Sequence, residues 1–319
     1  MCGITGKYYF AADREVDPGT IAAMTNVLSH RGPDDCGYYR GKNIALGHRR
    51  LSILDLSPAG HQPMCNEDGT VWVVFNGEIY NYKPLRVELE ALGHAFKSNT
   101  DTEVILHAYE QYGLDCVAKF RGMFAFGLWD ERCKRLVLAR DHFGIKPLYY
   151  HQNNSFISFA SEIKALIEDP EVPCEVDAQG LSNFITLHYV PGPRTMFGNI
   201  SKLLPGHILV VERGASRISK YWELRKQGTR VLSEQDAVEL IYQELRSSVK
   251  ERLQSDVPVG ALLSGGLDSS GVLALMTDLS QKSVPAFTVG YSQAGNDGFS
   301  EFKYSRIVAR HLQLSLIHI

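Results

Sequence analysis

A glycine-rich string between a strand pattern and a helix pattern restricts the fold more than any other feature of the chain. The string runs from Ser264 through Gly265, Gly266, Leu267 and Asp268 to Ser269 and Ser270. A β-rich run over 257–263 precedes it, a helical pattern over 268–279 follows, and a second β-rich run covers 286–289. Strand, helix and strand in this order are typical of a parallel α/β sheet.

The first two-thirds of the chain have a different pattern, in which short β-rich runs are separated by Gly, Asn and Asp. Helical spacing of apolar residues occurs in separate blocks, at 17–29, 83–92 and 102–112. Strands in runs and helices in blocks favour a layered α+β domain. The expected strands cover 44–54, 70–75, 123–129, 135–139, 148–151, 156–159 and 208–211.

The change of pattern divides the 319 residues into two domains. We expect the first over 2–212, a polar linker over 213–232, and the second over 233–319, beginning with a Ser233-capped helix over 234–253. One strand–helix–strand unit and a last helix over 302–312 cannot cover both faces of a parallel sheet, so this domain is expected to be incomplete. The final residues, 314–319, are expected to depart from the domain's pattern.

Composition excludes several classes of function. A net charge of −3 and a pI of 6.4 provide no basic surface for nucleic acid or anionic lipid. The longest apolar runs have strand length, and neither a membrane span nor a signal peptide is expected. The six cysteines form no C-x-x-C pair, which favours a reducing, cytoplasmic location.

The glycine-rich string can bind phosphate. Glycines let the backbone N–H groups approach an anion, and the positive end of the following helix reinforces this. Ser264 and Ser269 add hydroxyl donors, and Asp268 suits Mg²⁺ that bridges phosphates. The alternative is an ordinary turn between strand and helix. The string is not a G-x-x-x-x-G-K-[ST] loop, because no lysine follows its glycines.

Cys2 is the one cysteine whose position argues for chemistry. Removal of Met1 would leave Cys2 at the N-terminus, with its own α-amine beside its sulfur. An amine that titrates at about 7.7–8.0 can serve as the base for a thiol that titrates at about 8.5. The alternative is that this thiol has no role and that the motif arose by chance.

Four further residues are candidates for an acyl-transfer site. The amide of Asn76 and the N–H of Gly77 are the two donors that an oxyanion hole needs, although Asn-Gly is also a common hairpin turn. Arg50 can bind a carboxylate and Asp101 an ammonium, which are the two charged groups of an amino acid. Asp101 also suits the N-cap of the helix over 102–112.

The order of these motifs resembles the class II glutamine amidotransferase domain, and within that family the glutamine-hydrolysing asparagine synthetases. The motifs that carry the resemblance are Met1–Ile4, His30–Asp34, Arg50–Ile53, Asn76–Tyr82, Thr100–Glu103, Arg121–Phe126, Arg140–Tyr150 and Ala160–Leu166.

The resemblance implies an N-terminal-nucleophile αββα sandwich in which Cys2 attacks the glutamine amide. It implies that Asn76 and Gly77 stabilise the oxyanion, and that the amino-acid end of glutamine binds at Arg50, Leu51, Ser52, Ile53, Glu78 and Asp101.

The C-terminal string resembles the pyrophosphate loop of ATP pyrophosphatases. This likeness implies a parallel α/β domain that binds ATP with Mg²⁺ as a substrate complex, without a prosthetic group. Ser264–Ser269 are implied in phosphate binding. The backbone at Leu263 and at Val289 is implied in adenine binding.

The function implied is glutamine-dependent asparagine synthesis, with glutamine, ATP and aspartate as substrates and no nucleic-acid or membrane partner. The alternatives are amidation of another carboxylate, in a sugar acid or peptide, and a glutaminase alone. A glutamine-sensing module with an unprocessed N-terminus belongs to a different class. The acceptor pocket is expected beyond residue 319. The sequence is compatible with a homodimer and does not set the oligomeric state.

Overall fold

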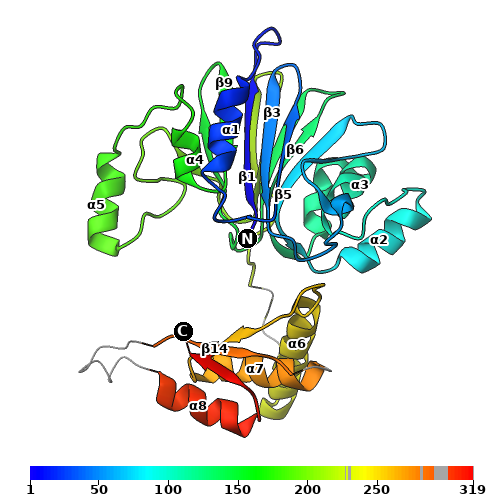
Figure 1. Cartoon of the computed structure of the whole chain (residues 1–319), viewed down its shortest axis with the longest axis vertical. Coiled ribbons are helices and arrows are strands. Elements are labelled where there is room, and N and C mark those ends of the chain that lie inside the picture. The colour runs from blue at the N-terminus through cyan, green and yellow to red at the C-terminus, as the bar shows by residue number, and fades with distance from the viewer. Residues whose placement is uncertain (227, 229–230, 281–282, 291–300, 319) are drawn as a thin grey trace. The chain divides into compact units, whose positions relative to one another are not determined.

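The computed structural model describes residues 1–226, 228, 231–280, 283–290 and 301–318. These form two compact units, of which the first comprises Met1–Arg225 and the second Lys226–Ile319. Figure 1 shows both, and each is described by itself below. Among the described residues, no helix is both long and apolar enough to cross a bilayer.

The first sheet of unit 1 has the order β10-β8-β9-β1-β3-β2, and every neighbouring pair is antiparallel. The inner strand β1, which follows directly on Cys2, is buried along its whole length. The strands are β1 (Gly3–Tyr9), β2 (Asp35–Arg40), β3 (Ile44–Arg50), β8 (Tyr149–Gln152), β9 (Phe156–Ala160) and β10 (Ser201–Lys202).

The second sheet has the order β12-β11-β7-β6-β5-β4 and is also antiparallel. Its inner faces and those of the first sheet share one apolar cluster, which includes Ile4, Tyr8, Trp129 and Phe159. The strands are β4 (Met64–Cys65), β5 (Val71–Ile79), β6 (Gly122–Asp130), β7 (Arg135–Arg140), β11 (His207–Glu212) and β12 (Ala215–Lys220).

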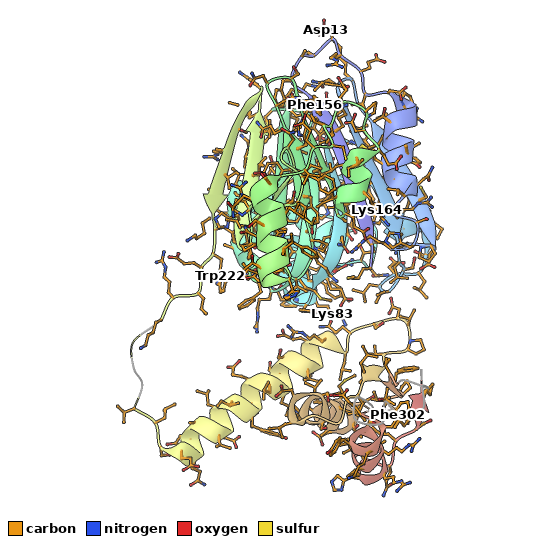
Figure 2. All side chains as sticks on the ribbon, turned by 90° about the vertical axis from the view of Figure 1, so that its left-hand side faces the viewer. Asp13, Lys83, Phe156, Lys164, Trp222 and Phe302 are labelled. Carbon is orange, nitrogen blue, oxygen red and sulfur yellow. The ribbon has the colours of Figure 1, made fainter. Side chains whose placement is uncertain are left out.

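Helices cover the outer faces of both sheets (Figure 1). Helices α1 (Pro18–Asn26) and α4 (Ile163–Ile167) pack on the first sheet, where Ile21, Met24 and Leu166 are buried. Helices α2 (Tyr82–Ala91) and α3 (Thr102–Tyr112) lie on the second. Side chains fill the space between the ribbons of this unit, with Phe156 among them (Figure 2). The αββα layering predicted from the sequence is therefore present. Helix α5 (Ala178–Leu187) and the short helices η1 (Pro58–Gly60) and η2 (Gly113–Lys119) complete the unit.

The segment predicted as linker, 213–232, begins with a strand instead. Strand β12 pairs with β11 through a two-residue turn in which Arg213 and Gly214 have φ of 51° and 82°. Positive φ at both positions is the hairpin geometry that matches strand twist. An Arg-Gly turn lacks the usual Asn or Asp signal, and all six residues of β12 are exposed, so apolar alternation did not reveal the strand.

Unit 2 contains a three-stranded parallel sheet in the order β13-β14-β15. Its helices are α6 (Glu234–Arg252), α7 (Leu267–Leu279) and α8 (Phe302–His311), and Ser233 caps α6 by accepting the N–H of Asp236. The strands are β13 (Ala261–Leu262), β14 (Ala286–Thr288) and β15 (Leu316–His318), so residues expected to leave the pattern form the third strand.

Two strands of unit 2 are shorter than predicted. The run over 257–263 yields only Ala261–Leu262, because Pro258 has no N–H to give to a ladder and Gly260 favours strand formation weakly. The run over 286–289 ends at Thr288, which leaves Val289 outside the strand with 57% of its surface exposed.

Candidate active site

A pocket of about 220 Å³ lies in unit 1 where the chain begins. Six segments meet there: the residues before β1, the end of β3 with the loop that follows it, the end of β5, the start of α3 with the loop before it, Met123 of β6, and Lys146 in the loop after β7. Ser52 is the one predicted glutamine-site residue that does not line this pocket; its N–H is bonded instead to the Asp34 carboxylate at 2.8 Å. The predicted residues that do line it are Cys2, Arg50, Leu51, Ile53, Asn76, Gly77, Glu78 and Asp101.

The sulfur of Cys2 is held by the backbone of Leu51. The Leu51 N–H approaches Sγ at 3.4 Å, and the thiol faces the Leu51 carbonyl oxygen at 3.7 Å. Burial raises the pKa of Cys2, and the hydrogen bond from Leu51 partly offsets this. The sulfur in this pocket therefore needs a base before it can attack.

The α-amine is the base nearest to that sulfur in sequence. With Met1 in place, the amine is half-buried beside Cys2, and burial lowers its pKa. A lowered pKa increases the fraction of free amine that can accept a proton. Removal of Met1 would break the Met1–Cys2 peptide bond and free the α-amine of Cys2 itself, which is the arrangement of an N-terminal nucleophile.

Asn76 and Gly77 lie inside β5, opposite Ala125 and Phe124 of β6. The alternative of an Asn-Gly hairpin turn is therefore wrong. Asn76 is 1% exposed, and within the described part of the chain neither its Nδ2 nor its Oδ1 has a hydrogen-bond partner. A buried amide without partners is costly, and such groups cluster at functional sites.

The Gly77 N–H faces the edge of β5 that points away from β6. On this strand the N–H groups of Phe75 and Ile79 point away from β6, since they donate to the Gln62 and Asp101 side chains. Strand alternation gives the intervening Gly77 N–H that same direction. A Cβ at this position would lie 2.2 Å from the Met123 carbonyl oxygen, so only glycine fits.

Asp101 is buried, and its carboxylate accepts the N–H of Ile79 at 2.7 Å. Burial raises the pKa of Asp101 to about 7, with the negative charge of Glu78 as a further cause. Asp101 occupies the predicted N-cap position of α3, but its side chain makes no capping bond to the helix. Two neighbouring carboxylates in a buried site favour a cation, such as an α-ammonium group.

Arg50 has a structural task that the sequence did not reveal. Its guanidinium donates to the carbonyl oxygens of Leu54, Asp55 and Ser57, at 3.1, 2.6 and 3.3 Å. The side chain thereby fixes the loop after β3 while it lines the pocket. A Cβ on Gly60 would lie 1.9 Å from its Nη2, so a larger residue there would displace the guanidinium.

Sequence reasoning missed two cations at this site. Arg31 donates from Nε to the Cys2 carbonyl oxygen at 2.8 Å and is anchored by Glu162, so it positions the nucleophile's backbone. Lys146 lines the pocket although it is 6% exposed, and burial lowers its pKa. The Asp141 carboxylate, which accepts the Lys146 N–H at 2.9 Å, holds that loop.

In unit 2 the glycine-rich loop joins β13 to the N-terminus of α7. Gly265 has φ of +85°, and a Cβ on it would lie 2.5 Å from the Ser305 nitrogen, so this position requires glycine. The hydroxyls of Ser264 and Ser269 are 3.0 Å apart, and Asp268 lies exposed in the first turn of α7. Buried Leu263 donates its N–H to Phe287, which ties the loop to β14.

Comparison with known families agrees with this geometry. The model of the glutamine amidotransferase domain matches residues 1–222. The chain belongs to this family. Residues 240–319 match the model of the asparagine synthase family. This amidotransferase chain therefore joins parts of two families, and the boundary between the matches falls near that between the two units.

Curated relatives extend the comparison. The chain is 38% identical to "Asparagine synthetase [glutamine-hydrolyzing] 1" of Bacillus subtilis over 99% of its own length and 50% of the relative. It is also 38% identical to "Amidase chry2" of Gibberella zeae, over 81% of its own length and 39% of that protein. The chain spans about half the length of the curated asparagine synthetases it matches.

Among solved structures, a glutamine phosphoribosylpyrophosphate amidotransferase from Bacillus subtilis aligns with 89% of this chain and 65% of its own, at a TM-score of 0.51 and 17% identity. This likeness concerns the fold alone. It confirms the predicted αββα sandwich fold for this amidotransferase.

Proposed function

We propose that unit 1 hydrolyses glutamine at Cys2 and supplies the ammonia for an ATP-dependent amidation that makes asparagine. The observation that carries this proposal is the buried amide of Asn76, without partners in the described chain, in the pocket that holds the Cys2 sulfur. A donor prepared for a charge that exists only during reaction has no partner at rest.

Glutamine binds with its charged end away from the sulfur. Its α-ammonium group meets the carboxylates of Asp101 and Glu78, and its α-carboxylate meets the Arg50 guanidinium. The side-chain amide then extends toward Cys2. Binding of the ammonium favours ionised Asp101, so glutamine affinity decreases as pH falls below about 7.

Hydrolysis proceeds in two steps. The α-amine of processed Cys2 takes the thiol proton, and the sulfur attacks the amide carbon while Asn76 Nδ2 and the Gly77 N–H stabilise the oxyanion. The C–N bond breaks, the amine returns the proton to the leaving nitrogen, and ammonia departs from a γ-glutamyl thioester. Water then attacks the thioester and releases glutamate and the thiol.

The second half-reaction belongs to the domain that begins in unit 2. A β-carboxylate oxygen of aspartate attacks the α-phosphorus of ATP and releases pyrophosphate. Ammonia that has passed from unit 1 then attacks the acyl carbon, and AMP leaves. Gly265, Gly266 and the hydroxyls of Ser264 and Ser269 fit a phosphate chain at the start of α7, with adenine near Leu263 and Val289. Bound Mg²⁺ would neutralise phosphate charge, and exposed Asp268 would hold it.

A second candidate keeps both half-reactions and changes the acceptor carboxylate. Relatives named as amidases match the chain at 35–38% identity, close to the identity of the named asparagine synthetases. A glutaminase without synthetase activity would keep only the first half-reaction of this proposal. Assaying amidation of aspartate by a version that carries the full synthetase domain separates these candidates.

Replacing the nucleophile tests the proposal. Cys2→Ala should abolish release of glutamate from glutamine, whereas Cys174→Ala, which removes an exposed thiol, should leave it unchanged. In the version with the full synthetase domain, Cys2→Ala should retain synthesis driven by added ammonia. Persistent glutamine hydrolysis in Cys2→Ala would show that the nucleophile is assigned wrongly.

A further inference from the structure

Three side chains that could bind a metal meet beside the C-terminal half of α3, outside the glutamine pocket. This cluster consists of His94, in the loop after α2, with His107 and Glu110 of α3. One ligand atom from each of the three lies within 4.8 Å of the others. His107 and Glu110 are three positions apart on the helix and share one face, which the loop brings His94 to meet.

Two of the three distances within the cluster are close to the donor spacing around a tetrahedral ion. Glu110 Oε2 is 3.1 Å from His107 Nδ1 and 3.7 Å from His94 Nδ1. Bonds of about 2.0–2.1 Å to Zn²⁺ place neighbouring donors roughly 3.3 Å apart. Both Glu110 distances therefore lie within about 0.4 Å of this spacing. The two histidine donors lie within 4.8 Å of each other, so coordination of all three ligands requires the rings to approach by up to about 1.5 Å.

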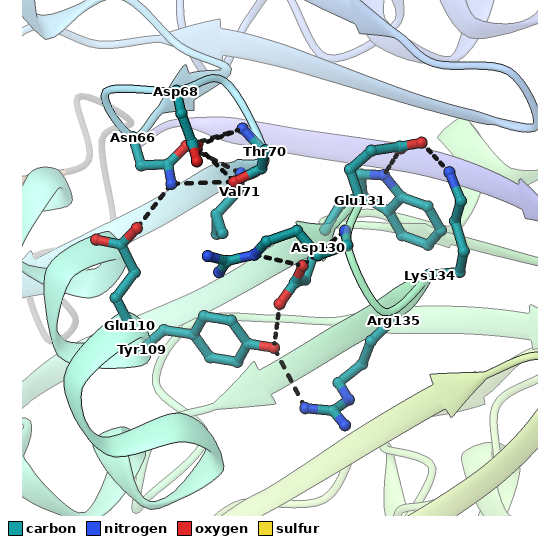
Figure 3. Close-up of polar contacts among 12 residues, drawn as sticks. Asn66, Asp68, Thr70, Val71, Tyr109, Glu110, Asp130, Glu131, Lys134 and Arg135 are labelled. Atoms are coloured by element: carbon teal, nitrogen blue, oxygen red, sulfur yellow. Dashed lines mark hydrogen bonds and ion pairs between the residues drawn. The ribbon is translucent and has the colours of Figure 1, made fainter.

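Two of the three side chains, His94 and Glu110, also have a hydrogen-bond partner for their other polar atom. His94 Nε2 faces Gln111 Oε1 at 3.1 Å, and Glu110 Oε1 accepts from Asn66 Nδ2 at 2.7 Å, which Figure 3 shows. His107 Nε2 faces a Glu103 oxygen at 3.7 Å, beyond hydrogen-bond distance, and has no hydrogen-bond partner in the described residues. Metal-bound histidines and carboxylates are oriented by such outer contacts.

Burial and packing fix the cluster. The His107 side chain is 1% exposed, and its ring contacts the Phe96 ring edge-on. His94 and Glu110 are each 17% exposed, so the cluster opens toward solvent on one side. A second acid, Glu67, lies 3.9 Å from His107 Nε2 and adds negative charge. A divalent cation can therefore enter, keep a water as its fourth ligand, and find compensating charge.

The geometry points to a structural site for a Zn²⁺-class divalent transition metal, bound by His94, His107 and Glu110. The metal would tie the loop after α2 to α3. That loop continues through Lys97 and Ser98, whose N–H groups bond to Glu103, to Thr100 and Asp101 of the glutamine pocket. The site lies outside the pocket and requires nothing of the glutaminase reaction.

Equilibrium dialysis of the whole chain against Zn²⁺ tests this inference. The chain should carry Cys2→Ala so that the pocket thiol contributes no ligand. We expect one Zn²⁺ per chain. His94→Ala and Glu110→Gln should each weaken binding at least about 10-fold, and Gln111→Leu about 10- to 100-fold, because an outer contact is lost. His207→Ala removes a half-buried histidine elsewhere in unit 1 and should change nothing.

Cobalt provides a second measurement that does not depend on stability. Co²⁺ bound to the same chain should show the visible absorption of a tetrahedral ion, and His94→Ala should abolish it while tryptophan fluorescence stays native. The inference is overturned if Zn²⁺ does not bind stoichiometrically at micromolar concentration, or if His94→Ala and Glu110→Gln bind as well as the parent chain. In either case the cluster is an ion-paired histidine only.

Discussion

Replacing Asn76 with alanine should separate catalysis from stability. Loss of one oxyanion donor lowers kcat for glutamine hydrolysis about 10²- to 10³-fold, which corresponds to about 2.7–4 kcal/mol of transition-state stabilisation. The KM for glutamine should change little, because Asn76 Nδ2 is prepared for the oxyanion and not for the bound substrate.

The structure predicts that this loss of activity costs little stability. Both polar atoms of the Asn76 amide are buried and, in the described chain, have no partner. Relief of a buried, unpaired polar group, about 1–3 kcal/mol, offsets the packing lost on truncation. We therefore expect the free energy of unfolding to change by less than about 1 kcal/mol.

Asn66 is the matched control. It is also buried, but its Nδ2 donates to Glu110 and Thr70 and its Oδ1 accepts the N–H groups of Thr70 and Val71, as Figure 3 shows. At about 1 kcal/mol for each bond, Asn66→Ala should destabilise unit 1 by about 3–4 kcal/mol. It should leave kcat nearly unchanged, because Asn66 does not line the pocket.

Urea unfolding followed by tryptophan fluorescence measures both variants. The three tryptophans, Trp72, Trp129 and Trp222, all belong to unit 1, so the signal reports on that unit. The reasoning is refuted if Asn76→Ala keeps its kcat, or if it destabilises unit 1 as much as Asn66→Ala does.

Three further changes have defined outcomes. Lys146→Met should raise the pKa of the Cys2 thiol by removing a nearby cation, and an unchanged pH profile of iodoacetamide alkylation would contradict this. Asp101→Asn should stabilise unit 1 at pH 8 but not at pH 4. Burial raises the pKa of the native Asp101 carboxyl to about 7, so the protonated carboxyl stabilises the folded state fully below pH 4, and this contribution is lost as pH rises through 7. Equal urea midpoints of the variant and the parent at pH 8 would argue against this. Gly265→Ala places a Cβ at a residue with φ of +85° that packs against α8. It should increase amide hydrogen exchange over 261–280 and leave tryptophan-detected unfolding of unit 1 unchanged. Amides that stay protected over 261–280 would count against the close packing.

Seven strands and three helices of unit 1 were predictable because their apolar residues repeat with clear periods, whereas β1, β2, β4, β10, β12, α4 and α5 were not predicted. Helix 102–112 has the predicted bounds, and the other helices differ by a few residues at their ends. Strand β5 was predicted to stop at Phe75, because Asn-Gly is a turn signal in local sequence. The ladder to β6 overrides that signal and carries the strand through Ile79. Pairing across the sheet is a long-range property that one segment does not display.

The site residues were predictable by type, but their roles depend on tertiary contacts. Asp101 looked equally suited to cap α3, and only the fold shows that its carboxylate turns to Ile79. Lys146 lies about 70 residues from Gly77 in the chain, and neither spacing nor composition links the two. Aspartate is a residue type that fixes turns, so Asp141 could have indicated a fixed loop before Lys146. In the structure its carboxylate accepts three N–H groups of that loop.

The most direct test of the central claim is mass spectrometry of the N-terminal peptide after the enzyme is mixed with glutamine and quenched in acid. The account predicts a peptide that begins at Cys2, without Met1, and carries a γ-glutamyl group on its sulfur during turnover. Retention of Met1 in an enzyme that hydrolyses glutamine, or a glutamyl group on a residue other than Cys2, would contradict it.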